Sequence, residues 1–161
     1  MESDIRWHQR LSNYQKALSN LSEAVEPTNS LLNAIIEQAA TIDDIAVIWL
    51  YGSQAKGTAN ENSDIDLAIA FNHFSLSALD RKVRPEEYAL TWSAALDLPE
   101  AKISVVDINT IPVYLAFNVV EYGKVIVCKN KARELKETQR IYSQYEFETI
   151  ERDIDRRARE Q

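Results

Sequence analysis

The chain has 161 residues, of which 45% are hydrophobic and 27% charged, and its formal net charge is −7. This length and composition predict one globular domain with a core of ordinary size. The negative charge argues against non-specific binding of nucleic acid, which depends on a basic surface. The single cysteine, Cys128, excludes an internal disulfide. No apolar stretch approaches membrane-spanning length and no signal peptide is found, so we expect a cytoplasmic protein without a membrane partner.

The first predicted element is an amphipathic helix over residues 5–25. Its apolar positions alternate in steps of four and three, at Trp7, Leu11, Tyr14, Leu18, Leu21 and Val25. Pro27 ends the helix. Residues 1–26 form a segment that either packs on its own domain or docks on a partner or a second copy. A second helix is predicted over residues 29–40, where Thr28 or Asn29 is the N-cap.

Strands and helices alternate in the next part of the chain. Strands are predicted over residues 45–51, 64–71, 101–108 and 124–128. Between the first two, Gly52 and Ser53 break the apolar run and residues 54–57 can form one helical turn.

Two further helices are predicted over residues 85–96 and 113–122, with Pro85 in the first turn of one and Asn109 or Thr110 capping the other. The interleaved order predicts an α/β fold with a mixed sheet covered by helices. A long charged helix over residues 131–161 follows this core.

Two carboxylates, Asp64 and Asp66, stand at the start of the second predicted strand. Side chains alternate along a strand, so both point to the same face. Neighbouring carboxylates repel each other and are costly to desolvate, and such a pair persists most easily where a cation lies between them. The pair therefore predicts a site for a divalent metal ion.

The turn before that strand suits a phosphate group. Gly52 lets the backbone approach a ligand closely, and Ser53 offers a hydroxyl followed by the first N–H groups of a helix. A phosphate cradle beside a pair of carboxylates makes a site for a nucleoside triphosphate. Lys56 could also reach the triphosphate, although a single surface lysine is more often only solvated.

The spacing between the Gly-Ser turn and the aspartate pair is similar to that of a known family. Gly52-Ser53, ten intervening residues and Asp64-Ile65-Asp66 resemble the GSx10DxD signature of the polymerase-beta-like nucleotidyltransferases. The surrounding YGSQAKGTANENSDIDLAI is similar to their minimal, single-domain branch, which includes antitoxins encoded beside HEPN-domain toxins. The resemblance implies a nucleotidyltransferase core over residues 29–128, with extra helices over residues 1–26 and 131–161.

The same resemblance implies roles and partners. Asp64 and Asp66 would hold Mg²⁺ or Mn²⁺, and Gly52 and Ser53 would bind the β- and γ-phosphates of ATP. The segment over residues 4–26 is also similar to the opening helix of small helical substrate-binding proteins that pair with minimal nucleotidyltransferases. A HEPN-family toxin or such a helical protein is therefore the expected partner, and no direct contact with nucleic acid is expected.

A third carboxylate is in doubt. Polymerase-like sites take one from the next core strand, and the matching position here is Ser104, while Asp107 matches a second Asp of the family pattern. Alternation places Ser104 and Asp107 on opposite faces, so Asp107 joins the site only through a bulge or an early strand end. Asp107 is retained as a candidate catalytic residue. Three outcomes stay open: a weakened enzyme, an enzyme that recruits Asp107 or another acid, or nucleotide binding without turnover.

The leading hypothesis is an enzyme, an antitoxin that transfers AMP from Mg·ATP to a hydroxyl of a HEPN-family toxin. One alternative is an antitoxin that acts by binding alone. Another is a small-molecule nucleotidyltransferase, although this chain has no room for the added substrate-binding domain usual there. His8 and His73 lack partners at metal-ligand spacing, and neither GxxxxGK[ST] nor GxGxxG occurs, so other nucleotide-binding classes lack support.

Overall fold

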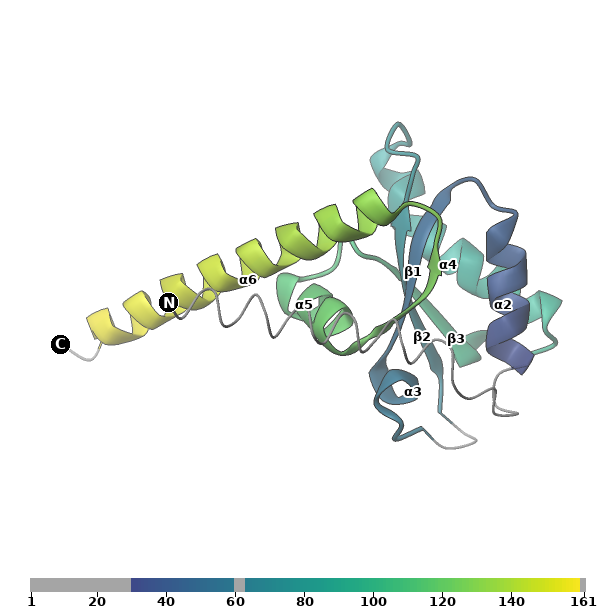
Figure 1. Cartoon of the computed structure of the whole chain (residues 1–161), viewed down its shortest axis with the longest axis horizontal. Coiled ribbons are helices and arrows are strands. Elements are labelled where there is room, and N and C mark those ends of the chain that lie inside the picture. Colours follow the sequence, from purple (N-terminus) through teal and green to yellow (C-terminus); the bar gives the residue numbers. More distant parts are fainter. Residues whose placement is uncertain (1–29, 60–62, 160–161) are drawn as a thin grey trace. The chain divides into compact units, whose positions relative to one another are not determined.

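The structure is a computed structural model that describes residues 30–59 and 63–159. The predicted helix over residues 5–25 lies outside the described residues. The elements are, in chain order, α2 (Ser30–Ala40), β1 (Ile45–Tyr51), α3 (Gly52–Lys56), β2 (Ile65–Phe71), α4 (Ala78–Ala95), the 3₁₀ turn η3 (Glu100–Lys102), β3 (Ile103–Asp107), α5 (Val113–Tyr122), β4 (Lys124–Cys128) and α6 (Lys131–Arg159) (Figure 1). No helix in this part of the chain is both long and apolar enough to cross a membrane.

The four strands form one mixed sheet in the order β3-β2-β1-β4. β1 is antiparallel to both β2 and β4, whereas β2 and β3 are parallel. A parallel pair needs a long crossover connection, and α4 provides it here. The predicted mixed α/β sheet is therefore confirmed.

Helices cover the sheet on both faces, with α5 and α6 on one side and α4 on the other (Figure 1). Trp49 and Ala68 of the sheet pack with Ala116 and Val119 of α5 and with Ile141 of α6. On the opposite face, Phe71, Tyr88 and Trp92 form a chain of aromatic contacts with centroid distances of 5.5 Å. The two central strands are buried from both sides, which explains their nearly continuous apolar sequences.

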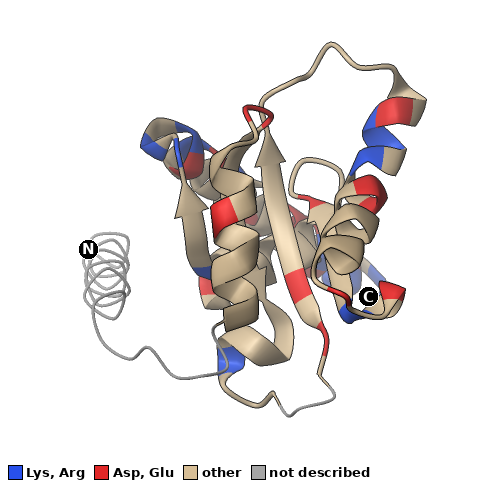
Figure 2. Cartoon of the chain, turned by 90° about the vertical axis from the view of Figure 1, so that its right-hand side faces the viewer, with Lys and Arg blue, Asp and Glu red and all other residues tan. Residues whose placement is uncertain are grey.

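Charged side chains are rare in the strands, which are mostly tan in Figure 2. The four strands contain three charged residues: Asp66 in β2, Asp107 in β3 and Lys124 in β4. Of these, Asp107 is buried and Asp66 is half-buried, so each carboxylate needs a physical explanation.

The predicted start of the helix at Pro85 is wrong, because α4 already begins at Ala78. Its N-cap is Ser77, whose Oγ accepts a hydrogen bond from the backbone N–H of Asp80 at 3.1 Å. Pro85 lies buried inside the helix, where it cannot donate a bond to the carbonyl of Arg81. The capping interaction and burial of the helix outweigh the loss of this one hydrogen bond.

The predicted caps of α5, Asn109 and Thr110, are also wrong, since the N-cap is Pro112. Thr110 instead donates its hydroxyl to the carbonyl of Asp107 at 3.2 Å, and the Asn109 side chain donates to Glu137 at 2.9 Å. Both residues stabilise the turn after β3. That strand begins at Ile103 rather than at residue 101, because the residues before it form the 3₁₀ turn.

A network of polar side chains joins the start of α6 to the sheet. Arg133 donates to the Glu137 carboxylate at 2.8 Å and to the carbonyl of Phe71 at 3.1 Å. Arg140 donates to the same carboxylate at 2.8 Å and to the carbonyl of Ile108 at 3.3 Å. Burial alone would raise the pKa of Glu137, but hydrogen bonds from Asn109, Arg140 and Arg133 lower it overall.

Candidate active site

Three polar side chains stand in one row across the end of the sheet. The register pairs Tyr51 of β1 with Asp66 of β2, and Asp66 with Ser104 of β3. Directly paired residues point to the same face, so all three lie on the side that α5 covers. Asp64 is exposed and comes immediately before β2. The structure thus brings Asp64, Asp66 and Ser104 to one end of the sheet.

The turn after β1 brings the backbone against the Asp66 carboxylate. Gly52 is the first residue of α3 and has a φ of 69°, in the left-handed region that favours glycine. A Cβ atom added to Gly52 would lie 2.3 Å from Oδ2 of Asp66. Both the conformation and this close approach therefore require glycine, which links the two halves of the motif physically.

Ser53 follows in the first turn of α3 and is half-buried. The first N–H groups of a helix have no acceptor within the helix and suit a phosphate oxygen. Lys56 is the last residue of α3 and is exposed, with its ammonium 6.0 Å from the ring centroid of Tyr122. Ser53 lies next to the glycine that contacts Asp66, whereas Lys56 points toward the end of α5.

Among the described residues, the two carboxylates have no cationic partner. Burial raises the pKa of Asp66, and the negative charge of Asp64 raises it further. No lysine, arginine or histidine within residues 30–59 and 63–159 forms an ion pair with either carboxylate. A divalent cation fits this pair, because it would relieve the repulsion and because carboxylate oxygens are the ligands that Mg²⁺ prefers.

The described residues offer few side chains that could bind a metal ion at this site. The described part of the chain contains no group of three or more His, Cys, Asp or Glu side chains that could hold a metal ion. Mg²⁺ is commonly bound through one or two carboxylates together with substrate phosphates and water. Two carboxylates beside the Gly52 turn therefore suit an ion that arrives with a nucleotide.

Asp107 lies away from the end of the sheet that carries Asp64 and Asp66. It pairs with Ile69 in a regular parallel register, three positions beyond the pair of Asp66 and Ser104, and strand alternation turns it to the opposite face. It is 4% exposed, and its carboxylate accepts bonds from Arg84 at 3.3 Å and from the backbone N–H of Asn109 at 2.9 Å. The structure does not bring Asp107 together with Asp64 and Asp66.

Two residues near these carboxylates had no assigned role in the sequence. Arg84 was missed because the helix was predicted to begin after it, at Pro85. In the sequence, Tyr51 is only the last residue of an apolar predicted strand. The sequence signal for Tyr51 is its position directly before Gly52. The register pairs Tyr51 with Asp66, so Tyr51 lies beside that residue.

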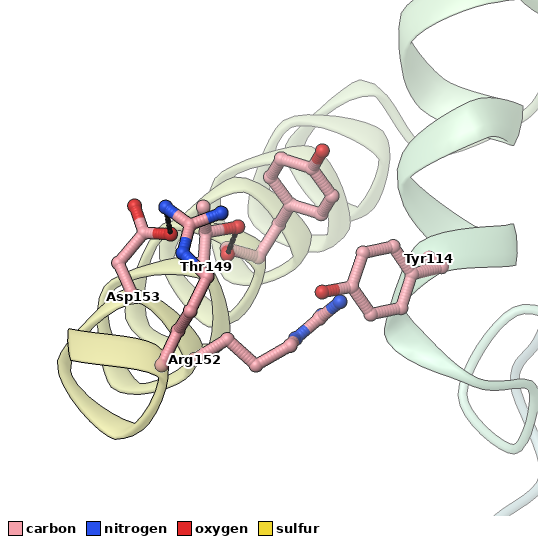
Figure 3. A pocket seen from close by; sticks show the side chains of 6 residues that line it. Tyr114, Thr149, Arg152 and Asp153 are labelled. Carbon is pink, nitrogen blue, oxygen red and sulfur yellow. Dashed lines mark hydrogen bonds and ion pairs between the residues drawn. The ribbon is translucent and has the colours of Figure 1, made fainter. Parts of the chain in front are cut away.

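A separate pocket of about 360 Å³ lies between α5 and α6 (Figure 3). Its lining combines aromatic, polar and charged side chains: Tyr114, Tyr145, Thr149, Arg152, Asp153 and Arg156. The guanidinium of Arg152 lies 4.0 Å from the ring centroid of Tyr114, and Arg156 forms an ion pair with Asp153 at 3.0 Å. None of these residues belongs to the Gly-Ser or Asp-x-Asp elements, so the pocket is not part of the candidate active site.

The fold and the site define a class of protein. The family model described as polymerase beta, nucleotidyltransferase matches residues 33–132, which is more than half of the chain. The chain belongs to this nucleotidyltransferase family. The predicted family and fold class are confirmed, although no curated protein matches the chain.

Solved structures show which branch it is similar to. A toxin–antitoxin crystal structure with AMP-PNP contains a chain 26% identical to this one, with a TM-score of 0.60 over 78% of this chain and 94% of that chain. A tri-AMPylated HEPN toxin of Shewanella oneidensis in complex with its MNT antitoxin matches at 26% identity and a TM-score of 0.56, over 77% and 91%. The toxin–antitoxin MntA-HepT matches at 25% identity with a TM-score of 0.56, over 77% and 92%.

Proposed function

We propose that this protein is an antitoxin that transfers AMP from Mg·ATP to a hydroxyl group of a HEPN-family toxin and thereby neutralises it. The observation that carries the proposal is the contact between Gly52 and Asp66, with Asp64 nearby and no cation from the described chain paired to either carboxylate. The AMP-PNP complex and the AMPylated toxin among the similar structures support the nucleotide and the acceptor.

The reaction joins an oxygen of the acceptor to the α-phosphorus of ATP. A new P–O bond forms to the acceptor, the bond to pyrophosphate breaks, and the acceptor hydroxyl gives its proton to solvent. Bound Mg²⁺ would neutralise charge on the triphosphate and on the leaving pyrophosphate. Asp64 and Asp66 would hold that ion, while the Gly52 turn lets phosphate oxygens approach the backbone and the Ser53 hydroxyl donates to one of them. In this proposal Asp107 belongs to the scaffold and not to the site.

A second candidate function is antitoxin activity by binding alone. It is favoured by one observation, the neutral Ser104 in the position directly paired with Asp66. In this candidate the two carboxylates near Gly52 hold the metal ion of a bound nucleotide, and among the described residues no third acid joins them to accept a proton. Both candidates predict a protein that acts in the cytoplasm beside its toxin.

The test is transfer of label from ATP labelled at the α-phosphate to the toxin encoded with this chain, in the presence of Mg²⁺. We expect the wild type to label the toxin and the Asp64→Asn/Asp66→Asn variant to leave it unlabelled. Asp153→Asn, which removes an exposed carboxylate on α6, is the matched control and should retain full transfer. A wild type that labels nothing, yet silences the toxin even with both aspartates replaced, would establish the binding-only function instead.

A further inference from the structure

The second half of α6 has one side fixed against α5. Tyr145 stacks on Phe117 with a centroid distance of 3.8 Å, and it meets the Tyr114 ring edge to face at 5.4 Å. Arg152 lies over Tyr114, and Thr149 lines the pocket between the two helices (Figure 3). The α6 residues of this group recur at steps of four and three, so they lie on one side of the helix. These contacts determine which side of α6 faces its own domain.

The opposite side of the same segment carries an apolar seam, which consists of Phe147, Ile150 and Ile154. Steps of three and four are the spacing of apolar positions in a coiled coil. Successive helical residues are about 100° apart, so the apolar seam lies nearly opposite the side that contacts α5. Its three side chains are 62%, 59% and 60% exposed. A helix at a protein surface ordinarily buries its apolar side, and this segment has the reverse arrangement.

The length of α6 leaves the apolar seam accessible to another molecule. Its 29 residues extend about 43 Å, compared with about 15 Å for the 10 residues of α5. In Figure 1 the second half of α6 extends beyond α5. A rotation of the helix that turned the seam toward α5 would break the stacking of Tyr145 on Phe117. Covering the seam therefore requires a surface other than α5.

The charges beside the apolar seam match a second copy of the same helix. Glu146 and Glu151 lie on its two edges, and Arg157 lies beyond Ile154 on the edge of Glu146. In a parallel pair, Glu146 of one copy lies beside Glu151 of the other, and this repulsion occurs twice. In an antiparallel pair, Glu146 of each copy lies beside Arg157 of the other, which gives two attractions and one approach of Glu151 to its own copy. The charge pattern therefore favours two copies in antiparallel orientation.

We propose that the protein forms a symmetric dimer in which the apolar seams of two α6 helices pack against each other in antiparallel orientation. Ile150 of each copy packs against Ile154 of the other, and Phe147 meets Arg157, whose guanidinium stacks on the ring. The same surface is used by both copies, as in most closed dimers. Since six apolar side chains make a small interface, we expect a dissociation constant in the micromolar range. None of these residues belongs to the candidate active site, so the inference does not rest on the proposed function.

The first experiment measures the association of the full chain by sedimentation equilibrium over micromolar concentrations. We expect a monomer–dimer equilibrium in wild type. Ile150→Glu places a charge in the seam of both copies and should weaken dimerisation at least about thirtyfold, because symmetry doubles the loss. Leu135→Glu is the matched control and should dimerise as wild type, since Leu135 is an exposed apolar residue of α6 outside the seam. Circular dichroism checks that each variant keeps its helices.

The second experiment tests the orientation by exchanging charges. Arg157→Glu turns both attractions of an antiparallel pair into repulsions and should weaken dimerisation about tenfold, while Glu146→Arg/Arg157→Glu should restore it. In a parallel pair Arg157 faces its own copy, so Arg157→Glu would exchange one repulsion for another and change little. An unchanged Arg157→Glu variant, or a double variant no better than the single one, would overturn the inference.

Three further results would also overturn it: a monomeric wild type, whatever else covers the apolar seam, a dimer that Ile150→Glu leaves intact, or a Leu135→Glu variant as weak as Ile150→Glu. If Ile150→Glu left the dimer intact but lowered affinity for the toxin, the seam would be a surface for the toxin instead. Transfer of AMP is measured separately, so none of these results decides the proposed function.

Discussion

The carboxylates on the two faces of the sheet have different partners. On the face covered by α4, Arg84 is 5% exposed and lies between Asp44 and Asp107, with N···O distances of 3.2 and 3.3 Å. The same guanidinium donates to the carbonyl of His73 at 2.9 Å and stacks 3.9 Å from the ring centroid of Phe71. On the other face, Asp66 contacts the Gly52 turn near the exposed Asp64, and no cation from the described residues pairs with them.

This difference supports the proposal that Asp107 is a structural carboxylate and that Asp66 binds a ligand. Breaking a buried ion pair leaves an uncompensated charge, so Asp107 contributes to stability as long as Arg84 holds it. Its charge is already neutralised and its hydrogen bonds are made, so it has little to offer a metal ion. Asp66 has the opposite properties. Burial and the charge of Asp64 raise its pKa and disfavour its charged form, and a bound cation would stabilise that form.

The largest effect is expected where the backbone touches Asp66. Gly52→Ala should reduce nucleotide transfer on the order of a hundredfold or more, comparable to loss of one preorganised electrostatic group, because the new Cβ displaces the carboxylate. Gly57→Ala is the matched control, since Gly57 has a similar φ of 71° but nothing within 4 Å of its added Cβ. Transfer rates and AMP-PNP affinities of the two variants give the comparison. Equal losses in both would show that backbone strain, and not the contact with Asp66, is responsible.

Two substitutions, one on each face of the sheet, test whether Asp107 serves stability and Asp66 serves binding. Asp107→Asn should lower the free energy of unfolding by about 3 kcal/mol, because it leaves Arg84 with one charged partner fewer, while AMP-PNP affinity stays near that of wild type. Asp66→Asn should do the reverse, abolishing Mg²⁺-dependent binding without lowering stability. Urea unfolding and calorimetry measure both quantities. If a stable Asp107→Asn variant lost nucleotide transfer, Asp107 would be part of the active site and the proposed difference between the two faces would be wrong.

The smallest expected effect concerns pH. The pKa of Glu137 is lowered in the folded protein, so the unfolded state binds the proton more tightly and stabilisation by this group is present above the unfolded pKa. It is lost as pH falls through the lowered folded value. Wild type should therefore lose more stability than Glu137→Gln between pH 6 and pH 3. Urea unfolding at several pH values measures this, and parallel profiles for both proteins would refute it.

Much of the fold followed from local patterns. The predicted bounds of β1, α5 and β4 agree with the structure, because each is an apolar run or stripe delimited by Gly, Pro or polar residues. The start of α4 did not follow, because Pro85 is a common first-turn residue and its place inside a buried helix depends on tertiary contacts. Arg84 was missed for the same reason.

For the site, the sequence by itself determined the Gly-Ser turn and the face of Asp66, since glycine geometry and strand alternation are local properties. The predicted common face of Asp64 and Asp66 stays a prediction, because β2 begins at Ile65 and Asp64 lies just before it. The sequence also predicted that Ser104 and Asp107 point to opposite faces, and the register agrees. Only the tertiary structure decided which carboxylate is already paired and which is not. Arg84 reaches Asp44 and Asp107, and Tyr51, Asp66 and Ser104 fall in one row, because the order of the strands and the placement of α4 bring together residues that are far apart in the chain.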